Sequence, residues 1–352
     1  MGETVMVGMS GGVDSSVAAA LLMKEGYAVT GATLWLCGKD STPPSDALDA
    51  KAVCDKLNIP HHIFELKKQF ESAVIGNFIS EYESGNTPNP CIECNRHIKF
   101  GEMIEKAESV GCTKIATGHY AVIKQNEAGR YLLYRPADRS KDQTYVLYGL
   151  TQRQLSKVVF PLGGLSKAQV RETAAELALI NADKPDSQDI CFVPNGDYAA
   201  FIEKHRGKEE TPGDFVDAAG NILGRHKGVI HYTIGQRKGL GIALGKPAFV
   251  LSKDAAANRV VLGEDESALF YRRVLVDRLN FIPFDELREP MRLTAKLRYR
   301  HTEQPATLYP SGDGQAIIEF DQPQRAPSPG QAAVFYDGDM VVGGGTIVAG
   351  IE

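Results

Sequence analysis

The sequence predicts an α/β domain built on a parallel sheet, followed by a small mixed or β-rich module and a C-terminal β-barrel. Up to about residue 200, apolar strand-like runs alternate with segments of helical periodicity, which is typical of a parallel sheet covered on both faces. After about Gly196, short strand-like runs are separated by Gly, Pro, Asn and Asp. A chain of 352 residues has room for two or three domains. We therefore expect domains at residues 1–200, 201–267 and 268–352.

The first domain should contain four strands and four helices in alternation. Helix ends follow from Asn58 and Pro60 after the second helix and from Gly111 after the fourth. The expected strands are Thr4–Met9, Ala28–Leu36, His61–Glu65 and Thr113–Thr117, and the expected helices are Val13–Lys24, Ser45–Leu57, Lys67–Glu83 and Ile98–Val110.

The remaining chain should be mostly strands joined by turns. Two alternating runs, Ala248–Leu251 and Arg259–Leu262, follow a glycine-rich stretch in the central module. Six further runs with turn signals between them predict a small barrel, at Val274–Leu279, Met291–Arg298, Ala306–Tyr309, Gln315–Phe320, Ala332–Tyr336 and Met340–Val348.

The run from Val5 to Ser16 places an apolar strand, a Ser/Gly turn and a helix start within a dozen residues. Gly11 and Gly12 lack a Cβ, so backbone N–H groups can approach an anion there. The following helix points its positive N-terminal end at the same place. Neither the Walker A pattern nor Gly-x-Gly-x-x-Gly occurs at this turn. The turn nevertheless predicts a phosphate site at the carboxyl edge of the sheet.

Charge and composition are those of a globular protein with local basic surface. The net charge is −5, yet residues 218–253 carry six basic side chains and no acid, and residues 290–302 carry four and no acid. Such stretches are compatible with binding a phosphate backbone and equally with a solvated basic face. No apolar run is long enough to cross a bilayer, and Met1 leads almost directly into the first strand. We therefore expect no membrane association and a cytoplasmic protein.

Six cysteines in such a chain favour metal, redox or nucleophilic roles over a disulfide scaffold. Cys91 and Cys94 are three residues apart, directly before the predicted helix at Ile98, and this position is expected to lower their pKa. Cys191 follows a polar turn. We expect Cys54 and Cys112 to be small buried hydrophobes, and Cys37 is left open.

The motifs carry a close resemblance to a known family. The turn Ser10-Gly-Gly-Val-Asp-Ser15 resembles the PP-loop of the ATP pyrophosphatase superfamily, whose domain has an adenine nucleotide alpha hydrolase-like fold. With it, several runs resemble the bacterial tRNA-specific 2-thiouridylases over essentially the whole chain: Thr87-Pro-Asn-Pro-Cys-x-x-Cys-Asn-Arg-x-Ile-Lys-Phe100, Ala116-Thr-Gly-His-Tyr120, Lys141-Asp-Gln-Thr-Tyr145, Asp186-Ser-Gln-Asp-Ile-Cys-Phe192 and Tyr232-Thr-Ile-Gly-Gln-Arg-Lys-Gly-Leu240.

This resemblance implies ATP-dependent 2-thiolation of the wobble uridine, position 34 of tRNA, with release of AMP and pyrophosphate. It implies Cys94 as nucleophile and Cys191 as carrier of the persulfide sulfur. The implied ATP-binding residues are Gly8, Met9, Ser10, Gly11, Gly12, Val13, Asp14, Ser15, Leu34 and Gly118. The implied tRNA-binding residues are Asn89, Pro90, Cys91, His119, Lys141, Asp142, Gln143, Arg298, Tyr299 and Gln331.

The implied cofactors and partners are ATP with Mg²⁺, the anticodon stem-loop of the Lys, Glu and Gln tRNAs, and a sulfur-relay protein or cysteine desulfurase. Many family members have aspartate where this chain has Cys91. Cys91, Cys94 and Cys191 as three thiolates would therefore also suit a [4Fe–4S] cluster with an open iron, and zinc with His97 is a further possibility.

Two other functions remain compatible with the residues. One is a PP-loop ligase in which an amine attacks an adenylated substrate, and such an enzyme would have no use for Cys94 and Cys191. The other is a non-catalytic RNA-binding or metal-sensing module that retains a nucleotide fold, for which tRNA binding would be indifferent to ATP.

Overall fold

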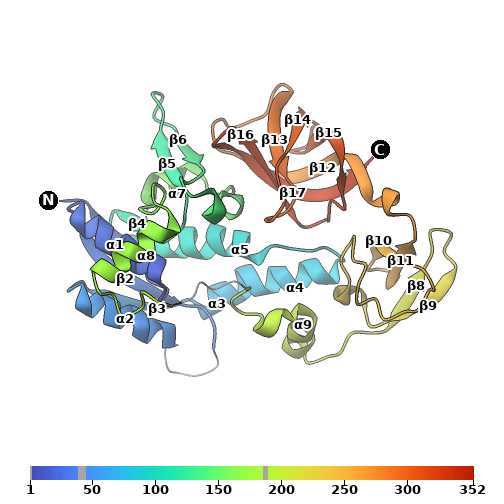
Figure 1. The fold of residues 1–352 in the computed structure, drawn as a ribbon, viewed down its shortest axis with the longest axis horizontal. Coiled ribbons are helices and arrows are strands. Elements are labelled where there is room, and N and C mark those ends of the chain that lie inside the picture. Colours follow the sequence, from blue (N-terminus) through green and yellow to red (C-terminus); the bar gives the residue numbers. More distant parts are fainter. Residues whose placement is uncertain (1, 39–44, 185–188) are drawn as a thin grey trace.

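The computed structural model describes residues 2–38, 45–184 and 189–352 and contains three sheets (Figure 1). The first is a parallel five-stranded sheet in the order β3-β2-β1-β4-β7. The prediction of a parallel sheet in the N-terminal domain is confirmed. Its strands are β1 (Thr4–Gly8), β2 (Ala28–Trp35), β3 (His61–Glu65), β4 (Lys114–Ala116) and β7 (Val158–Val159).

Helices cover both faces of this sheet, because the central strands are apolar on both sides. Val5 and Val7 pack into a cluster with α1 (Val13–Lys24), α2 (Ser45–Lys56) and α8 (Lys167–Glu176), while Met6 packs on the opposite face with α6 (Met103–Ser109) and α7 (Gln152–Lys157). The two-sided burial fits the continuous apolar sequence of β1.

Two expected helices each contain a π-helical stretch, and one of them begins earlier than the sequence indicated. The helix expected at Lys67–Glu83 is α3 (Lys67–Phe70), a π-helical turn η1 (Glu71–Ile75) and α4 (Gly76–Glu83). The helix expected to begin at Ile98 begins at Pro90, as α5 (Pro90–Glu93), the π-helix η2 (Cys94–Glu102) and α6. Asn89 accepts a hydrogen bond from the Cys91 backbone N–H, and Pro90 occupies the first helical position, both ordinary start signals. The two cysteines therefore lie inside the helix, and the prediction that they precede it was wrong.

The central module is a four-stranded sheet in the order β10-β11-β8-β9. Its elements are η5 (Pro194–Gly196), α9 (Tyr198–Arg206), β8 (Gly213–Val216), β9 (Ile222–His226), η6 (Val229–His231), β10 (Phe249–Asp254) and β11 (Arg259–Gly263). Its apolar residues share a cluster with α4 and with Cys94, so this module packs against the helices that lie between β3 and β4 in the chain.

The C-terminal strands form a closed barrel, because β12 pairs with β15 on one side and with β17 on the other. The predicted barrel is confirmed. The hairpin β5 (Val122–Gln125) and β6 (Tyr131–Tyr134) extends this sheet through one pair, Met340 with Tyr134. The remaining elements are η3 (Arg139–Lys141), η4 (Thr144–Val146), η7 (Glu266–Leu269), β12 (Phe270–Phe281), β13 (Met291–Lys296), β14 (Gln304–Pro310), β15 (Ala316–Arg325), β16 (Ala332–Asp337) and β17 (Met340–Ile351).

Within the ranges given above, the structure has no helix of the length and apolar character needed to cross a bilayer.

Candidate functional site

The turn between β1 and α1 has the backbone form of an anion site. Gly11 has a φ of +70°, in the left-handed region that glycine adopts freely. Gly12 is extended and is the N-cap of α1, and it makes no side-chain cap hydrogen bond. The N–H groups of the first turn of α1 are therefore not occupied by a cap and can face a phosphate.

Two other segments approach this turn so closely that only glycine fits. A Cβ on Gly118, just after β4, would lie 2.8 Å from the Ser15 backbone nitrogen, and a Cβ on Gly11 would lie 2.7 Å from the Asp46 carbonyl oxygen. The ends of β1 and β4 and the start of α2 thus form one compact edge. Leu34, near the end of β2, is partly buried against two of the apolar clusters.

Asp14 is held by two residues that the sequence analysis did not single out for this purpose. Lys167 Nζ lies 2.7 and 2.9 Å from the two Asp14 carboxylate oxygens, and the Tyr120 hydroxyl donates to Oδ1 at 2.8 Å. Lys167 comes from α8, 153 residues along the chain, so no local pattern identifies it. These contacts hold the Asp14 carboxylate in place at the phosphate end of α1.

Asn181 supports the same turn from a buried position. Its amide nitrogen donates to the Gly11 carbonyl at 3.0 Å and to Ser16 Oγ at 2.9 Å. We predict that Asn181→Ala lowers stability by about 1–3 kcal/mol, because both acceptors lose a buried donor, and raises the KM for ATP. Thermal denaturation and ATP-dependent kinetics measure both, with Asn221→Ala in an exposed turn as the control. Unchanged values for both would contradict the supporting role.

The thiols of Cys94 and Cys191 belong to segments that meet in one apolar cluster. Cys94 is buried at the start of η2 and shares that cluster with Phe192, the residue after Cys191. The Phe192 ring contacts the rings of Phe70, Phe78 and Phe201 at centroid distances of 5.6, 5.3 and 5.3 Å. These aromatic contacts fix the Cys191 segment, whose upstream residues 185–188 of the predicted motif lie outside the described residues.

The thiol pKa values differ from the sequence-based expectation. Burial raises the pKa of Cys94 to about 11 and also raises the pKa of Cys91 and of Cys191. The expectation of lowered values was wrong because loss of hydration outweighs the nearby positive charge. The charge that opposes burial at all three thiols is that of Lys99.

The π-helical form of η2 explains why Lys99 faces Cys94. In an α-helix, residues five apart are rotated by about 140° around the axis, because one turn takes 3.6 residues. In a π-helix, hydrogen bonds join residues five apart, so Cys94 and Lys99 lie on the same side. Burial, and to a smaller extent the positive charge of Lys99, lowers the pKa of His119 well below its usual value. Lys99 makes no ion pair with a carboxylate among the residues described.

We predict that Lys99→Met moves the pH dependence of Cys94 and Cys191 alkylation to higher pH. Lys99 stabilises the thiolate, so its removal raises the thiol pKa further and lowers the thiolate fraction at neutral pH. Lys99→Arg should retain the original profile, and Lys106→Met on α6 serves as the control. Mass-spectrometric rates of iodoacetamide labelling measure the effect, and an unchanged midpoint in Lys99→Met would contradict it.

Of the other three cysteines, two are buried as expected, and the third is close enough to Cys94 and Cys191 to be affected by their charges. Cys54 and Cys112 are buried, which confirms their assignment as small hydrophobes. Cys37, after β2, is exposed as a whole residue, but its sulfur is partly desolvated. This loss of hydration, followed by the charges of Cys191 and Cys94, raises its pKa to about 12. Among the described residues, no three Cys, His, Asp or Glu side chains form a metal-binding group. Cys91, Cys94 and Cys191 therefore do not form a ready site for an iron–sulfur cluster, nor do the two cysteines of α5 and η2 form one for zinc with His97.

Several of the residues implied to contact tRNA lie near the thiols, although their polar groups are partly used within the protein. The charges of Asp142, Lys141 and Cys91 all act on the hydroxyl of Tyr299, an exposed barrel residue beside Arg298. The remaining implied contacts have internal partners: Gln143 Oε1 accepts from the Tyr120 N–H at 2.8 Å, Gln331 Nε2 donates to the Thr87 carbonyl at 2.7 Å, His119 Nδ1 lies 2.8 Å from Thr117 Oγ1, Asn89 caps α5, and Pro90 is buried.

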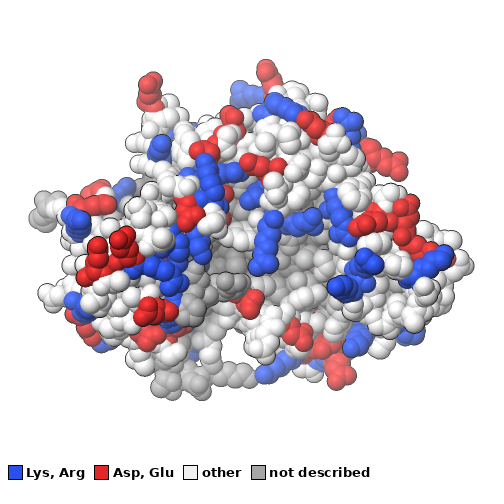
Figure 2. Space-filling model, viewed as in Figure 1, with Lys and Arg blue, Asp and Glu red and all other residues white. Residues whose placement is uncertain are grey.

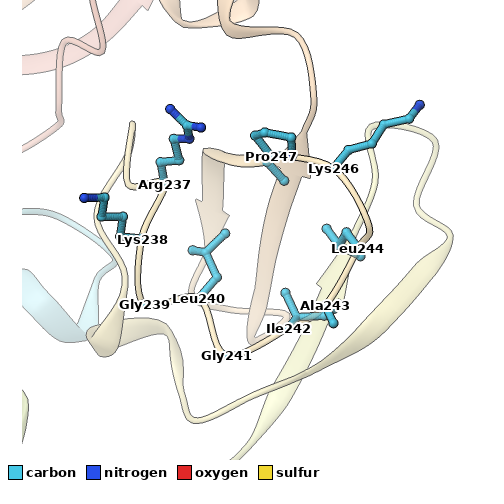
Figure 3. Close-up of a pocket in the computed structure, with 11 residues that line it drawn as sticks. Arg237, Lys238, Gly239, Leu240, Gly241, Ile242, Ala243, Leu244, Lys246 and Pro247 are labelled. Carbon is cyan, nitrogen blue, oxygen red and sulfur yellow. The ribbon is translucent and has the colours of Figure 1, made fainter.

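Basic side chains gather around a hollow between the sheet domain and the two β modules. Figure 2 shows Lys and Arg on both sides of this hollow in the face shown there. Residues 237–248 of the central module surround a separate cavity of about 640 Å³. In Figure 3, Arg237 and Lys238 point away from the ring formed by this segment, whereas Leu240 and Ile242 point into it. The surface thus offers positive charge for a polyanion despite the net charge of −5.

A glycine-rich anion turn at the carboxyl edge of a parallel sheet, with cysteine thiols on adjoining segments, defines a PP-loop nucleotide-binding enzyme. Family models match three parts of the chain: a tRNA methyl transferase HUP domain (residues 3–195), a tRNA methyl transferase PRC-barrel domain (residues 199–264) and an aminomethyltransferase beta-barrel domain (residues 271–347). Relatives about half identical to the chain over nearly its whole length are tRNA-specific 2-thiouridylases. The chain therefore belongs to that family of ATP-dependent PP-loop sulfurtransferases that act on tRNA.

The relatives resemble the chain over its full length. The tRNA-specific 2-thiouridylase MnmA of Acetivibrio thermocellus is 53% identical over 98% of this chain and 99% of its own. That of Heliobacterium modesticaldum is 50% identical over 100% of this chain and 94% of its own. Among solved structures, a 4-thiouridine synthetase–RNA complex with bound ATP covers 57% of this chain and 50% of its own, with 18% identity and a TM-score of 0.37, a distant likeness.

Proposed function

We propose that this protein converts the C2 carbonyl of the wobble uridine of tRNA into a thiocarbonyl, using ATP and a cysteine persulfide. The observation that carries this proposal is that the positive charge of Lys99 acts on the thiols of Cys91, Cys94 and Cys191 and also on His119. His119 lies three residues beyond β4 and directly after Gly118 at the phosphate turn. Adenylation and sulfur transfer would therefore take place at adjoining positions.

ATP is needed because a uracil carbonyl oxygen is a poor leaving group. In the proposed first step, the uridine O2 attacks the α-phosphate of ATP and pyrophosphate leaves. The triphosphate would bind at Gly8–Ser15, with Leu34 and Gly118 alongside. Mg²⁺ suits the Asp14 carboxylate, because Mg²⁺ is commonly held by one or two carboxylates together with substrate phosphates, and it would neutralise the pyrophosphate charge.

Sulfur would reach the base through covalent catalysis. The terminal sulfur of a Cys191 persulfide attacks C2 of the adenylated uridine, and AMP leaves with the original oxygen. The Cys94 thiolate then attacks the Cys191 sulfur, which leaves the transferred sulfur on the base and a Cys94–Cys191 disulfide that an external thiol must reduce. Alternatively, Cys94 attacks the persulfide first and releases sulfide, which then attacks C2.

The proposed RNA substrate is the anticodon stem-loop of the Lys, Glu and Gln tRNAs, in the cytoplasm. The base would lie against Asn89, Pro90 and Cys91, with His119, Lys141, Asp142, Gln143, Arg298, Tyr299 and Gln331 around the RNA. The outward-facing Arg237 and Lys238 suit contacts to backbone phosphates. A cysteine desulfurase or a sulfur-relay protein would supply the persulfide.

The test is mass spectrometry of tRNA nucleosides after incubation with ATP, Mg²⁺ and a cysteine desulfurase system. Formation of 2-thiouridine together with AMP supports the proposal. AMP formation with an amine-containing product would instead indicate a PP-loop ligase, and tRNA binding indifferent to ATP, without AMP, would indicate a binding module.

The iron–sulfur alternative requires a separate measurement. Anaerobic purification with quantification of iron and sulfide distinguishes the two sulfur routes. A colourless, iron-free enzyme with full activity supports the persulfide route, whereas activity proportional to bound cluster would replace it.

A further inference from the structure

A loop of the C-terminal barrel holds the segment that leads into the two helix cysteines. The Thr87 N–H donates to the Pro329 carbonyl at 2.8 Å, and the Gln331 side-chain amide donates to the Thr87 carbonyl at 2.7 Å. Both backbone polar groups of Thr87 are therefore satisfied by the barrel rather than by the first domain. The barrel loop is itself fixed, because Gly330 donates to the Ile347 carbonyl and the Ile347 N–H donates to the Gln331 carbonyl.

The approach of the two segments depends on Gly330. Its φ of +85° is one that glycine adopts freely. A Cβ at this position would lie 2.8 Å from the Asn86 Cβ and 3.0 Å from the Thr87 nitrogen. Any other residue would push residues 86–87 away from the barrel.

A second contact ties the start of the same segment to the barrel. The Arg278 guanidinium of β12 lies 3.4 Å from Glu81 Oε1, and Glu81 Oε2 accepts a hydrogen bond from the Asn86 side-chain amide at 2.6 Å. A cavity of about 20 Å³, lined in part by Pro88 and Gly330, remains at this junction, which is room for about one water molecule. The end of α4 and the segment that follows it are thus held to the barrel at Glu81, Asn86 and Thr87.

The segment that the barrel holds leads directly, within a few residues, into the two cysteines of the helix. Asn89 is two residues after Thr87, and its side chain caps α5 at the Cys91 N–H. Cys91 and Cys94 follow within the next five residues. We propose that Gly330 and Gln331 are positioning residues, through which the C-terminal barrel sets the place of Cys91 and Cys94. The inference deepens the proposed function, since it makes the barrel part of the sulfur-transfer site, and it gives Gln331 a role within the protein in addition to the RNA contact implied by resemblance.

Gln331→Glu is the first test, because glutamate has the same size but no amide donor. Its carboxylate would face the Thr87 carbonyl. Gln304→Glu is the matched control, since the Gln304 amide donates only to Thr302 in its own turn. We expect Gln331→Glu, without tRNA, to accelerate hydrogen exchange in residues 86–93 and iodoacetamide labelling of Cys94 several-fold. We also expect kcat for thiolation at saturating tRNA to fall roughly tenfold or more, as for other displaced catalytic groups.

Gly330→Ala and Gly314→Ala form the second test. Gly314 also has a positive φ, +72°, but a Cβ there meets nothing within 4 Å. Both variants place alanine at a positive φ and should lose thermal stability, and Gly330→Ala should lose more because of its added clash. Only Gly330→Ala should loosen residues 86–93.

The outcomes separate this inference from the proposed function. Native-like exchange and Cys94 labelling in both Gln331→Glu and Gly330→Ala would overturn the positioning role, and a weaker tRNA affinity alone in Gln331→Glu would leave Gln331 as an RNA contact only. Both structural readouts apply to the protein without tRNA. They therefore decide the inference even if the mass-spectrometric assay shows no 2-thiouridine.

Discussion

Replacing Cys191 or Cys94 by serine is expected to abolish 2-thiouridine formation while ATP binding is retained. Serine keeps the size of the side chain but cannot carry a persulfide or take part in a disulfide, so no alternative route for the sulfur remains. We expect a loss of at least ~1,000-fold in kcat, as for removal of other catalytic nucleophiles. The measurement is 2-thiouridine by mass spectrometry, together with ATP affinity by calorimetry.

Matched controls come from cysteines other than Cys94 and Cys191. Cys112 is buried at the end of a helix and has no expected chemistry, so Cys112→Ser should retain thiolation at some cost in stability. Cys91→Ser separates the persulfide route from the cluster alternative, because only the cluster needs a third thiolate. Thiolation retained in Cys191→Ser or Cys94→Ser would refute the proposed sulfur route.

Retention of AMP formation is the second readout of the same variants. The phosphate turn is built by β1, α1 and Gly118, and none of these elements depends on the two thiols. Adenylation of tRNA should therefore continue in Cys191→Ser, with AMP released by hydrolysis at a reduced rate. Loss of both activities would indicate that the cysteines also support the fold, which circular dichroism and thermal denaturation would reveal.

Local patterns were sufficient for most of the first sheet. The strand at His61–Glu65 and the helix at Val13–Lys24 begin and end where expected, because strand-like apolar runs and stop signals coincide there. The phosphate turn was predictable for the same reason, since all of its features lie within one short segment. Burial of Cys54 and Cys112 followed from their apolar neighbours.

Contacts between distant segments were beyond local patterns. Lys167 and Asn181 reach the phosphate turn from more than 150 residues away, and Gln331 reaches Thr87 across 244 residues. The π-helical winding of η2 was equally hidden, because the periodicity of a short helix does not distinguish it from an α-helix. The direction of the thiol pKa shifts depends on how far each thiol is removed from water, which the sequence does not show. The sequence-based expectation therefore included the charges of Arg96, His97 and Lys99 but not the opposing loss of hydration.

Gly118→Ala should nearly eliminate ATP-dependent activity while the protein remains folded. A Cβ at this position would lie 2.8 Å from the Ser15 nitrogen and 2.9 Å from the Asp14 carbonyl carbon, and both are backbone atoms of the phosphate turn. The first turn of α1 would have to shift, and its N–H groups would no longer converge on the phosphates. A shift of this kind typically costs about 100-fold in rate, and the added methyl group costs about 1–3 kcal/mol in stability.

Gly164→Ala is the control for this substitution, since a Cβ there meets nothing within 4 Å and the residue lies in the same domain. Pyrophosphate release in the presence of tRNA and ATP measures adenylation without requiring a sulfur donor, so the result does not depend on the thiols. Because Gly118 acts on the turn and the cysteines act on sulfur, Gly118→Ala should lose AMP formation, whereas Cys191→Ser should keep it. Normal adenylation in Gly118→Ala would mean that the turn between β1 and α1 is not where the triphosphate binds.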